Sequence, residues 1–145
     1  MPGTKDITTD DIGFLLAKAS AHFNELLVER FAAAGFPDVR PSYGSVLVPL
    51  FEHDAMRLGE LAGAARLSKQ AITGLVAQCE RAGLVERQRD PTDGRAFVVR
   101  LGSRGRSFRA VAERVLADLE GQLVQQLGPR NRQALARALR GVMQL

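Results

Sequence analysis

The sequence has few of the residues that build covalent cross-links or metal centres. It contains a single cysteine, Cys79, among its 145 residues, so it can form no internal disulfide and no multi-cysteine metal site. Its two histidines, His22 and His53, lie far apart in the sequence, and neither metal-ligand spacing nor a catalytic set of residues surrounds them. We therefore expect no metal, no cofactor and no enzymatic activity.

Long apolar runs are also lacking. No stretch approaches the roughly 18 apolar residues of a membrane span, and the first residues do not form a basic segment followed by an apolar run and a cleavage site. We therefore expect a cytoplasmic protein that does not bind membranes. Apolar residues make up 46% of the chain and charged residues 25%, which is typical of a folded protein, and the length favours one domain over residues 1–145.

Positive charge is concentrated in the middle of the chain. The net charge is only +4, but the segment from Arg66 to Arg109 contains ten basic and four acidic residues, whereas the remainder contains ten basic and twelve acidic residues. An anionic partner responds to the local distribution of charge rather than to the total. The pattern favours a phosphate-facing module, although solvated arginines on an ordinary surface would give the same pattern.

Two long amphipathic segments flank this basic centre. Apolar residues recur at steps of three and four over residues 12–31 and 108–127, which predicts long helices with one apolar stripe each. Gly128 interrupts the second segment before a last amphipathic stretch. These stripes, within residues 10–34 and 103–143, are longer than one small lobe can cover, so we predict that they form a homodimer interface.

The central segment, residues 42–101, has the pattern of a helix-turn-helix. A short helix around residues 58–62 is followed by a turn and by a second helix that runs from Ser68, its N-cap, to about Ala82. Cys79 falls on the apolar face of this second helix. A core thiol is therefore favoured over a redox sensor, because a buried thiol forms little thiolate.

A β-hairpin is predicted directly after this helix. Residues 97–101 alternate as a strand does, and an extended segment begins at Leu84. Between them, residues 90–94 are rich in turn formers. A hairpin after a helix-turn-helix is a wing, so the predicted fold is mainly α with a small β-hairpin wing: a winged helix-turn-helix with long N- and C-terminal dimerisation helices.

Five blocks of sequence resemble the MarR family of regulators, in the same order and at compatible spacing. They are Met56–Ala62, Leu67–Thr73, Arg81–Arg87, Asp90–Arg95 and Leu101–Arg106. Gly74 departs from the family pattern, since many relatives have a larger polar or basic residue there. The resemblance extends over nearly the whole chain and implies a dimeric transcriptional regulator that binds double-stranded DNA.

The resemblance assigns the first turns of the second helix to the major groove. Ser68, Lys69, Gln70 and Thr73 lie there, where amide and hydroxyl groups can contact base edges and lysine can neutralise phosphate. The alternative is a capped helix start exposed to solvent.

The wing is the second DNA-binding element that the resemblance implies. Arg95 lies at its tip, where a guanidinium can enter a narrow minor groove. Asp93 is interpreted as a support that orients Arg95 or an adjacent arginine, and Arg87 and Arg89 as phosphate contacts. The alternative readings are turn residues and a solvated arginine surface.

The family also suggests a ligand site. Phe23, Tyr43 and Leu47 are candidates to line the crevice between the dimer helices and the central lobe, where many MarR-type proteins bind small aromatic or lipophilic molecules. Ordinary core packing explains these three residues equally well. The function implied is that of a repressor on a pseudo-palindromic operator, released by such an effector. The alternatives are a ligand-independent or architectural DNA-binding protein and a winged helix that mediates protein contacts.

Overall fold

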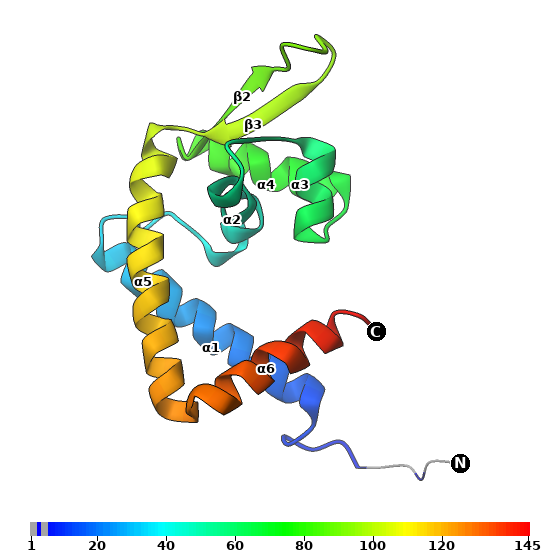
Figure 1. The fold of residues 1–145 in the computed structure, drawn as a ribbon, viewed down its shortest axis with the longest axis vertical. Coiled ribbons are helices and arrows are strands. Elements are labelled where there is room, and N and C mark those ends of the chain that lie inside the picture. Colours follow the sequence, from blue (N-terminus) through cyan, green and yellow to red (C-terminus); the bar gives the residue numbers. More distant parts are fainter. Residues whose placement is uncertain (1–2, 4–5) are drawn as a thin grey trace.

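The computed structural model describes residue 3 and residues 6–145, and the chain is mostly helical (Figure 1). Its elements are α1 (Ile12–Ala33), the 3-10 helix η1 (Pro41–Tyr43), α2 (Gly44–Glu52), β1 (Ala55–Arg57), α3 (Leu58–Ala65), α4 (Lys69–Arg81), β2 (Val85–Arg89), β3 (Phe97–Leu101), α5 (Ser103–Leu127) and α6 (Pro129–Val142). The lobe formed by residues 41–101 lies at one end, and α1, α5 and α6 extend away from it (Figure 1).

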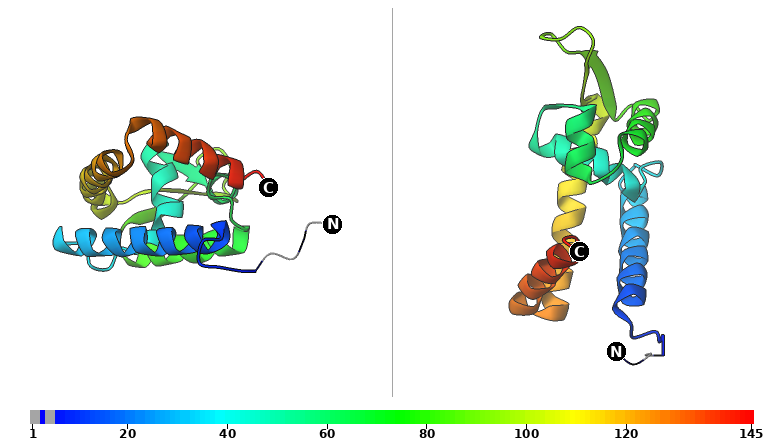
Figure 2. Two further views of the ribbon diagram at one scale, coloured as in Figure 1. Left: turned by 90° about the horizontal axis from the view of Figure 1, so that it is seen from below. Right: turned by 90° about the vertical axis from the view of Figure 1, so that its right-hand side faces the viewer.

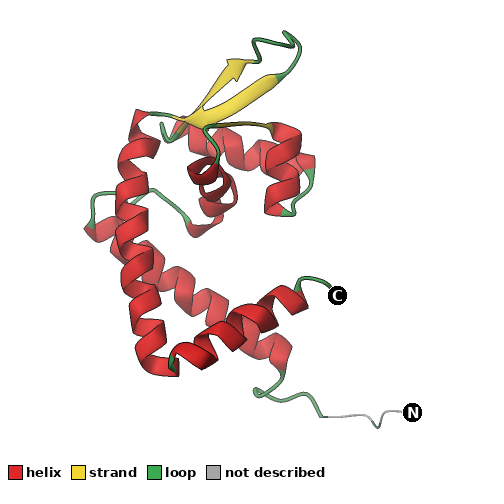
Figure 3. Ribbon diagram, in the orientation of Figure 1, coloured by secondary structure: helices red, strands yellow, loops and turns green. Residues whose placement is uncertain are grey.

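The predicted fold class, a winged helix-turn-helix, is confirmed, with one addition. The sheet has three antiparallel strands in the order β1-β3-β2 and lies at one end of the molecule (Figure 3). Its third strand, β1, was not predicted. It is only three residues long and pairs Met56 with Val99. A segment this short has no alternating pattern, so its pairing with β3 is decided by the tertiary structure.

The core of the lobe lies between α2, α3, α4 and the sheet. Leu47, Leu61, Ile72 and Val99 are among its fully buried side chains. Cys79 belongs to the same core, as its place on the apolar face of α4 predicted, and burial raises the pKa of its thiol to about 12. The thiol is therefore protonated at neutral pH.

Two glycines allow α5 to begin directly against the lobe. A Cβ on Gly105 would lie closer than 3.0 Å to the carbonyl oxygen of Leu84, and one on Gly102 would lie 3.0 Å from that of Gly83. The amide of Gly102 also donates to the Leu84 carbonyl at 2.9 Å. The start of α5 thus touches the backbone that connects α4 to the wing.

The long helices remain largely uncovered beyond this junction. They extend below the lobe as two arms, α1 and the α5–α6 pair (Figure 2). Ile12 on α1 is 66% exposed, and α6 has no buried residue, although Leu135 and Leu139 follow one another on its apolar face. Within the described residues, no helix is long and apolar enough to cross a membrane.

Candidate nucleic-acid interface

The first turn of α4 has two exposed side chains, Lys69 and Gln70, that form no hydrogen bond with the described part of the protein. Ser68 is the N-cap, and its Oγ accepts a hydrogen bond from the Ala71 amide at 3.1 Å. The Thr73 hydroxyl donates to the Lys69 carbonyl at 2.7 Å. Lys69 and Gln70 are exposed, and no other described residue hydrogen-bonds to their side chains. The helix start therefore offers a cation and a carboxamide to a partner, while Ser68 has a structural role as well.

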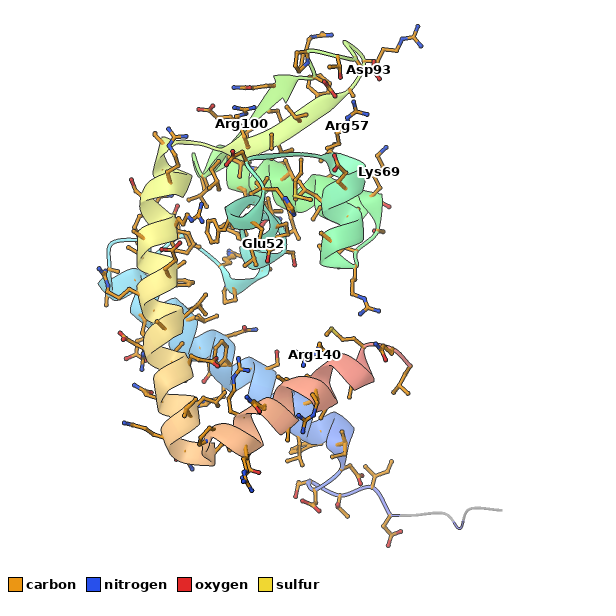
Figure 4. The ribbon with its side chains drawn as sticks, in the orientation of Figure 1. Glu52, Arg57, Lys69, Asp93, Arg100 and Arg140 are labelled. Carbon is orange, nitrogen blue, oxygen red and sulfur yellow. The ribbon has the colours of Figure 1, made fainter. Side chains whose placement is uncertain are left out.

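The wing presents a free arginine beside a structured turn. Arg95 is exposed, and its backbone amide donates to the Asp93 carboxylate at 3.1 Å. Asp93 therefore supports the main chain of Arg95 and leaves the guanidinium available. In Figure 4, Asp93 and Lys69 lie on the same edge of the lobe, with Arg57 between them. The wing tip and the start of α4 can thus face one extended partner.

The other two wing arginines have partners within the protein. The guanidinium of Arg87 pairs with the Glu80 carboxylate of α4 at 3.1 Å. The guanidinium of Arg89 donates to the Gly94 carbonyl at 2.8 Å and lies 5.7 Å from the ring centre of Phe97. A guanidinium has five N–H donors, so both arginines retain donors for phosphate. Their role as phosphate contacts stays a prediction.

An ion pair beneath the wing was not predicted. Asp90 is buried at the end of β2, and its carboxylate accepts hydrogen bonds from the Thr92 amide at 2.9 Å and the Thr92 hydroxyl at 2.8 Å, and pairs with Arg57 of β1. The Thr92 hydrogen bonds, together with the pairing with Arg57, lower the pKa of Asp90 to about 2. Asp-Pro-Thr is a recognisable turn motif, but no sequence signal identifies a partner 33 positions earlier.

The three candidate ligand residues differ in their exposure to solvent. Leu47 is 1% exposed and Tyr43 7% exposed, both in the core, whereas Phe23 is 37% exposed on α1. A nearby open groove of about 600 Å³ between α1 and η1 is lined by other residues: Ala21, Asn24, Glu25, Val28, Glu29, Arg40, Pro41 and Ser42. The assignment of Phe23, Tyr43 and Leu47 to a ligand site stays a prediction.

Comparison with known proteins identifies the lobe. Residues 41–97, which contain the helix-turn-helix and the first strand and turn of the wing, match the sequence profile of the MarR family. The lobe therefore resembles the MarR family in sequence. No curated protein sequence matches the chain.

Solved structures with the MarR fold superpose along nearly the entire chain. A probable transcriptional regulator from Pseudomonas aeruginosa is 25% identical, with a TM-score of 0.78 over 92% of this chain and 97% of its own. The transcriptional repressor CouR, solved with a 23-mer DNA duplex, is 24% identical, with a TM-score of 0.80 over 96% and 99%. PcaV from Streptomyces coelicolor, solved with its natural ligand, is 18% identical, with a TM-score of 0.80 over 97% and 98%. The similarity therefore includes the long helices, and these relatives are regulators rather than enzymes.

Proposed function

We propose that this protein is a homodimeric, sequence-specific DNA-binding regulator that acts as a repressor. The observation that carries the proposal is the pair of free groups on one edge of the lobe: Lys69 and Gln70 at the start of α4, and Arg95 on the wing. An α-helix fits the major groove, where a carboxamide can contact adenine through two hydrogen bonds. A wing arginine is attracted to the negative potential of the adjacent minor groove.

The uncovered apolar faces of α1 and α6 support the homodimer. Ile12, Leu15, Leu135 and Leu139 are all exposed in the single chain, and a second copy would bury them. A two-fold dimer carries two recognition helices, so its operator is a pseudo-palindrome with half-site centres about 10 base pairs apart or a multiple of that distance.

The groove between α1 and η1 supports an effector. Its volume of about 600 Å³ is within the range of small-molecule sites, and it combines apolar Val28 with one cation, Arg40, and two carboxylates, Glu25 and Glu29. A neutral aromatic or lipophilic molecule matches this lining better than an anion, because the two carboxylates would repel a third. In one protein of similar fold, BpsR from Bordetella bronchiseptica, 6-hydroxynicotinic acid regulates DNA binding. Release of DNA requires that the effector bind the DNA-free arrangement of the dimer more tightly.

Selection from a pool of random duplexes tests DNA recognition. The purified wild-type protein is expected to enrich one pseudo-palindromic sequence, and a variant with alanine at positions 69, 70 and 95 is expected to enrich none. Circular dichroism of both proteins shows whether the variant is folded. A folded wild-type protein that enriches no duplex would contradict the proposal and favour a winged helix that binds proteins.

Titration of small aromatic compounds into the protein–operator complex tests the effector. Benzamide and 6-hydroxynicotinic acid serve as a neutral and an anionic probe, and Val28→Glu, which adds a charge to the groove, is expected to raise the concentration of the neutral probe that is needed for release. A second candidate is ligand-independent DNA binding, which is favoured by the burial of Tyr43 and Leu47 in the core. Operator affinity that no aromatic or lipophilic compound alters would support this second candidate.

A further inference from the structure

One side chain outside the DNA-facing edge joins three separate parts of the chain. Arg104, in the first turn of α5, donates to both carboxylate oxygens of Asp38, at 2.6 and 2.8 Å. It also donates to the carbonyl oxygen of Ala82 at 2.8 Å. Its guanidinium lies 5.1 Å from the ring centre of Phe36. The linker after α1, the end of α4 and the start of α5 therefore meet at one guanidinium.

The geometry is more specific than that of an ordinary surface ion pair. A bidentate arginine–carboxylate pair fixes the plane of the guanidinium, which a lysine cannot reproduce. Ala82 is the C-cap of α4, at the end of the helix where carbonyls lack a partner within the helix. The chain leaves α4 through Gly83, whose φ is +74°. Arg104 thus fixes the C-terminal end of α4, the proposed recognition helix.

The same residue is connected to both long helices. Phe108, one turn further along α5, packs edge-on against Phe31 of α1 at 4.8 Å and against Phe36 at 5.2 Å between ring centres. A displacement of α1 relative to α5 therefore moves Phe36 and Asp38 relative to Arg104. Because Arg104 also binds Ala82, that displacement reaches the end of α4.

We propose that Arg104 is a positioning residue that transmits the relative placement of α1 and α5 to the recognition helix, and so sets the half-site spacing that the dimer accepts. The proposal rests on the proposed DNA-binding function. It predicts that loss of the Arg104 contacts leaves each lobe able to bind a half-site but weakens the preference for one spacing.

The test measures affinity for the selected operator and for operators whose half-site spacing is changed by one base pair. Arg104→Gln is expected to reduce the ratio of these affinities by about five-fold or more, the lower range of typical coupling between sites. Asp38→Asn is expected to act in the same direction. Glu113→Gln is the matched control, because it also removes the carboxylate of an arginine pair, with Arg109 at 2.9 Å, but both members of that pair lie in α5. Its ratio is expected to stay at the wild-type value.

A second control separates positioning from stability. Val115→Ala removes buried volume from α5 without touching Arg104, so it should lower the melting temperature and leave the spacing ratio unchanged. If Arg104→Gln does not fold, Arg104→Lys serves instead, since it keeps the charge and loses the planar fork. A wild-type ratio in the folded Arg104 variant would overturn the inference. A wild-type protein that selects no operator would overturn the proposed function, and this inference with it.

Discussion

Inside the lobe, Leu61, Ile72 and Val99 are fully buried, whereas α6, with a comparable apolar stripe, buries none of its residues. The lobe closes on itself because three helices and a sheet cover one another. The long helices α1 and α6 extend past that core, and their apolar faces remain open in the single chain. The same helical spacing of apolar residues is therefore buried in the lobe and exposed on the long helices. We propose that a second copy of the chain buries the exposed faces.

The largest expected effect comes from a substitution at the junction between the lobe and α5. Gly105→Ala should lower the free energy of unfolding by about 3 kcal/mol or more, because the added methyl group would collide with the backbone of Leu84. Gly121→Ala in the same helix is the control: nothing lies within 4 Å of its new Cβ, so it should raise stability by about 0.5–1 kcal/mol. Urea denaturation followed by circular dichroism measures both. Equal responses would show that α5 does not depend on this close approach.

The second prediction concerns the exposed apolar face of α6, which a second copy of the chain is proposed to bury. The substitutions lie outside the lobe. Replacing both Leu135 and Leu139 by Glu should weaken dimer association by at least about ten-fold, because charges would face the interface. Arg137→Glu, also an exposed position of α6, should leave association nearly unchanged. Sedimentation analysis gives the dissociation constants, and circular dichroism checks the fold. A wild-type protein that is monomeric at micromolar concentration would contradict the dimer.

The third prediction separates two proposed roles within the lobe, base discrimination and electrostatic affinity for DNA. Gln70→Ala should reduce discrimination between operator and unrelated duplex by roughly 1–3 kcal/mol, because its proposed contact is to a base edge. Arg95→Ala should instead weaken binding to both duplexes alike and reduce the salt dependence by about one phosphate equivalent per wing. Titrations at several salt concentrations distinguish the two. An unchanged affinity and salt slope in Arg95→Ala would contradict the role of the wing.

The fourth prediction concerns acid stability of the wing. The folded-state pKa of Asp90 is about 2, below its ordinary value of 3.8, so its carboxylate stabilises the fold above about pH 4, and this contribution is lost as the pH falls towards 2. Asp90→Asn should flatten this part of the pH dependence. NMR titration of the Asp90 carboxyl and thermal melts between about pH 5 and pH 2 measure the effect. An ordinary pKa for Asp90 would contradict the turn seen beneath the wing.

The smallest expected effect comes from a substitution in the middle of α4. Gly74 is exposed in the middle of α4, and a Cβ there would meet nothing within 4 Å. Gly74→Ala should therefore raise the free energy of unfolding by up to about 1 kcal/mol. Gly83→Ala is the contrasting control, because its φ of +74° is unfavourable for alanine and should lower stability. Urea denaturation measures both, and a destabilising Gly74→Ala would contradict the open position.

The local patterns of the sequence were sufficient for the long helices, for the helix-turn-helix and for the two strands of the wing. Apolar spacing predicted the helices and the burial of Cys79, since it follows the period of the helix. Ser68 predicted the start of α4 because capping depends only on nearby residues. The exposure of Lys69, Gln70 and Arg95 followed from the same local patterns.

Long-range partners were decided by the tertiary structure alone. The strand β1 exists because β3 pairs with it, and Arg57 finds Asp90 across 33 positions. Gly105 is required because α5 touches the Leu84 backbone, and Arg104 acquires its role from Asp38, 66 positions away. Periodicity and capping depend on neighbouring residues along the chain, whereas these contacts depend on where separate elements meet, and no pattern within either segment specifies that meeting.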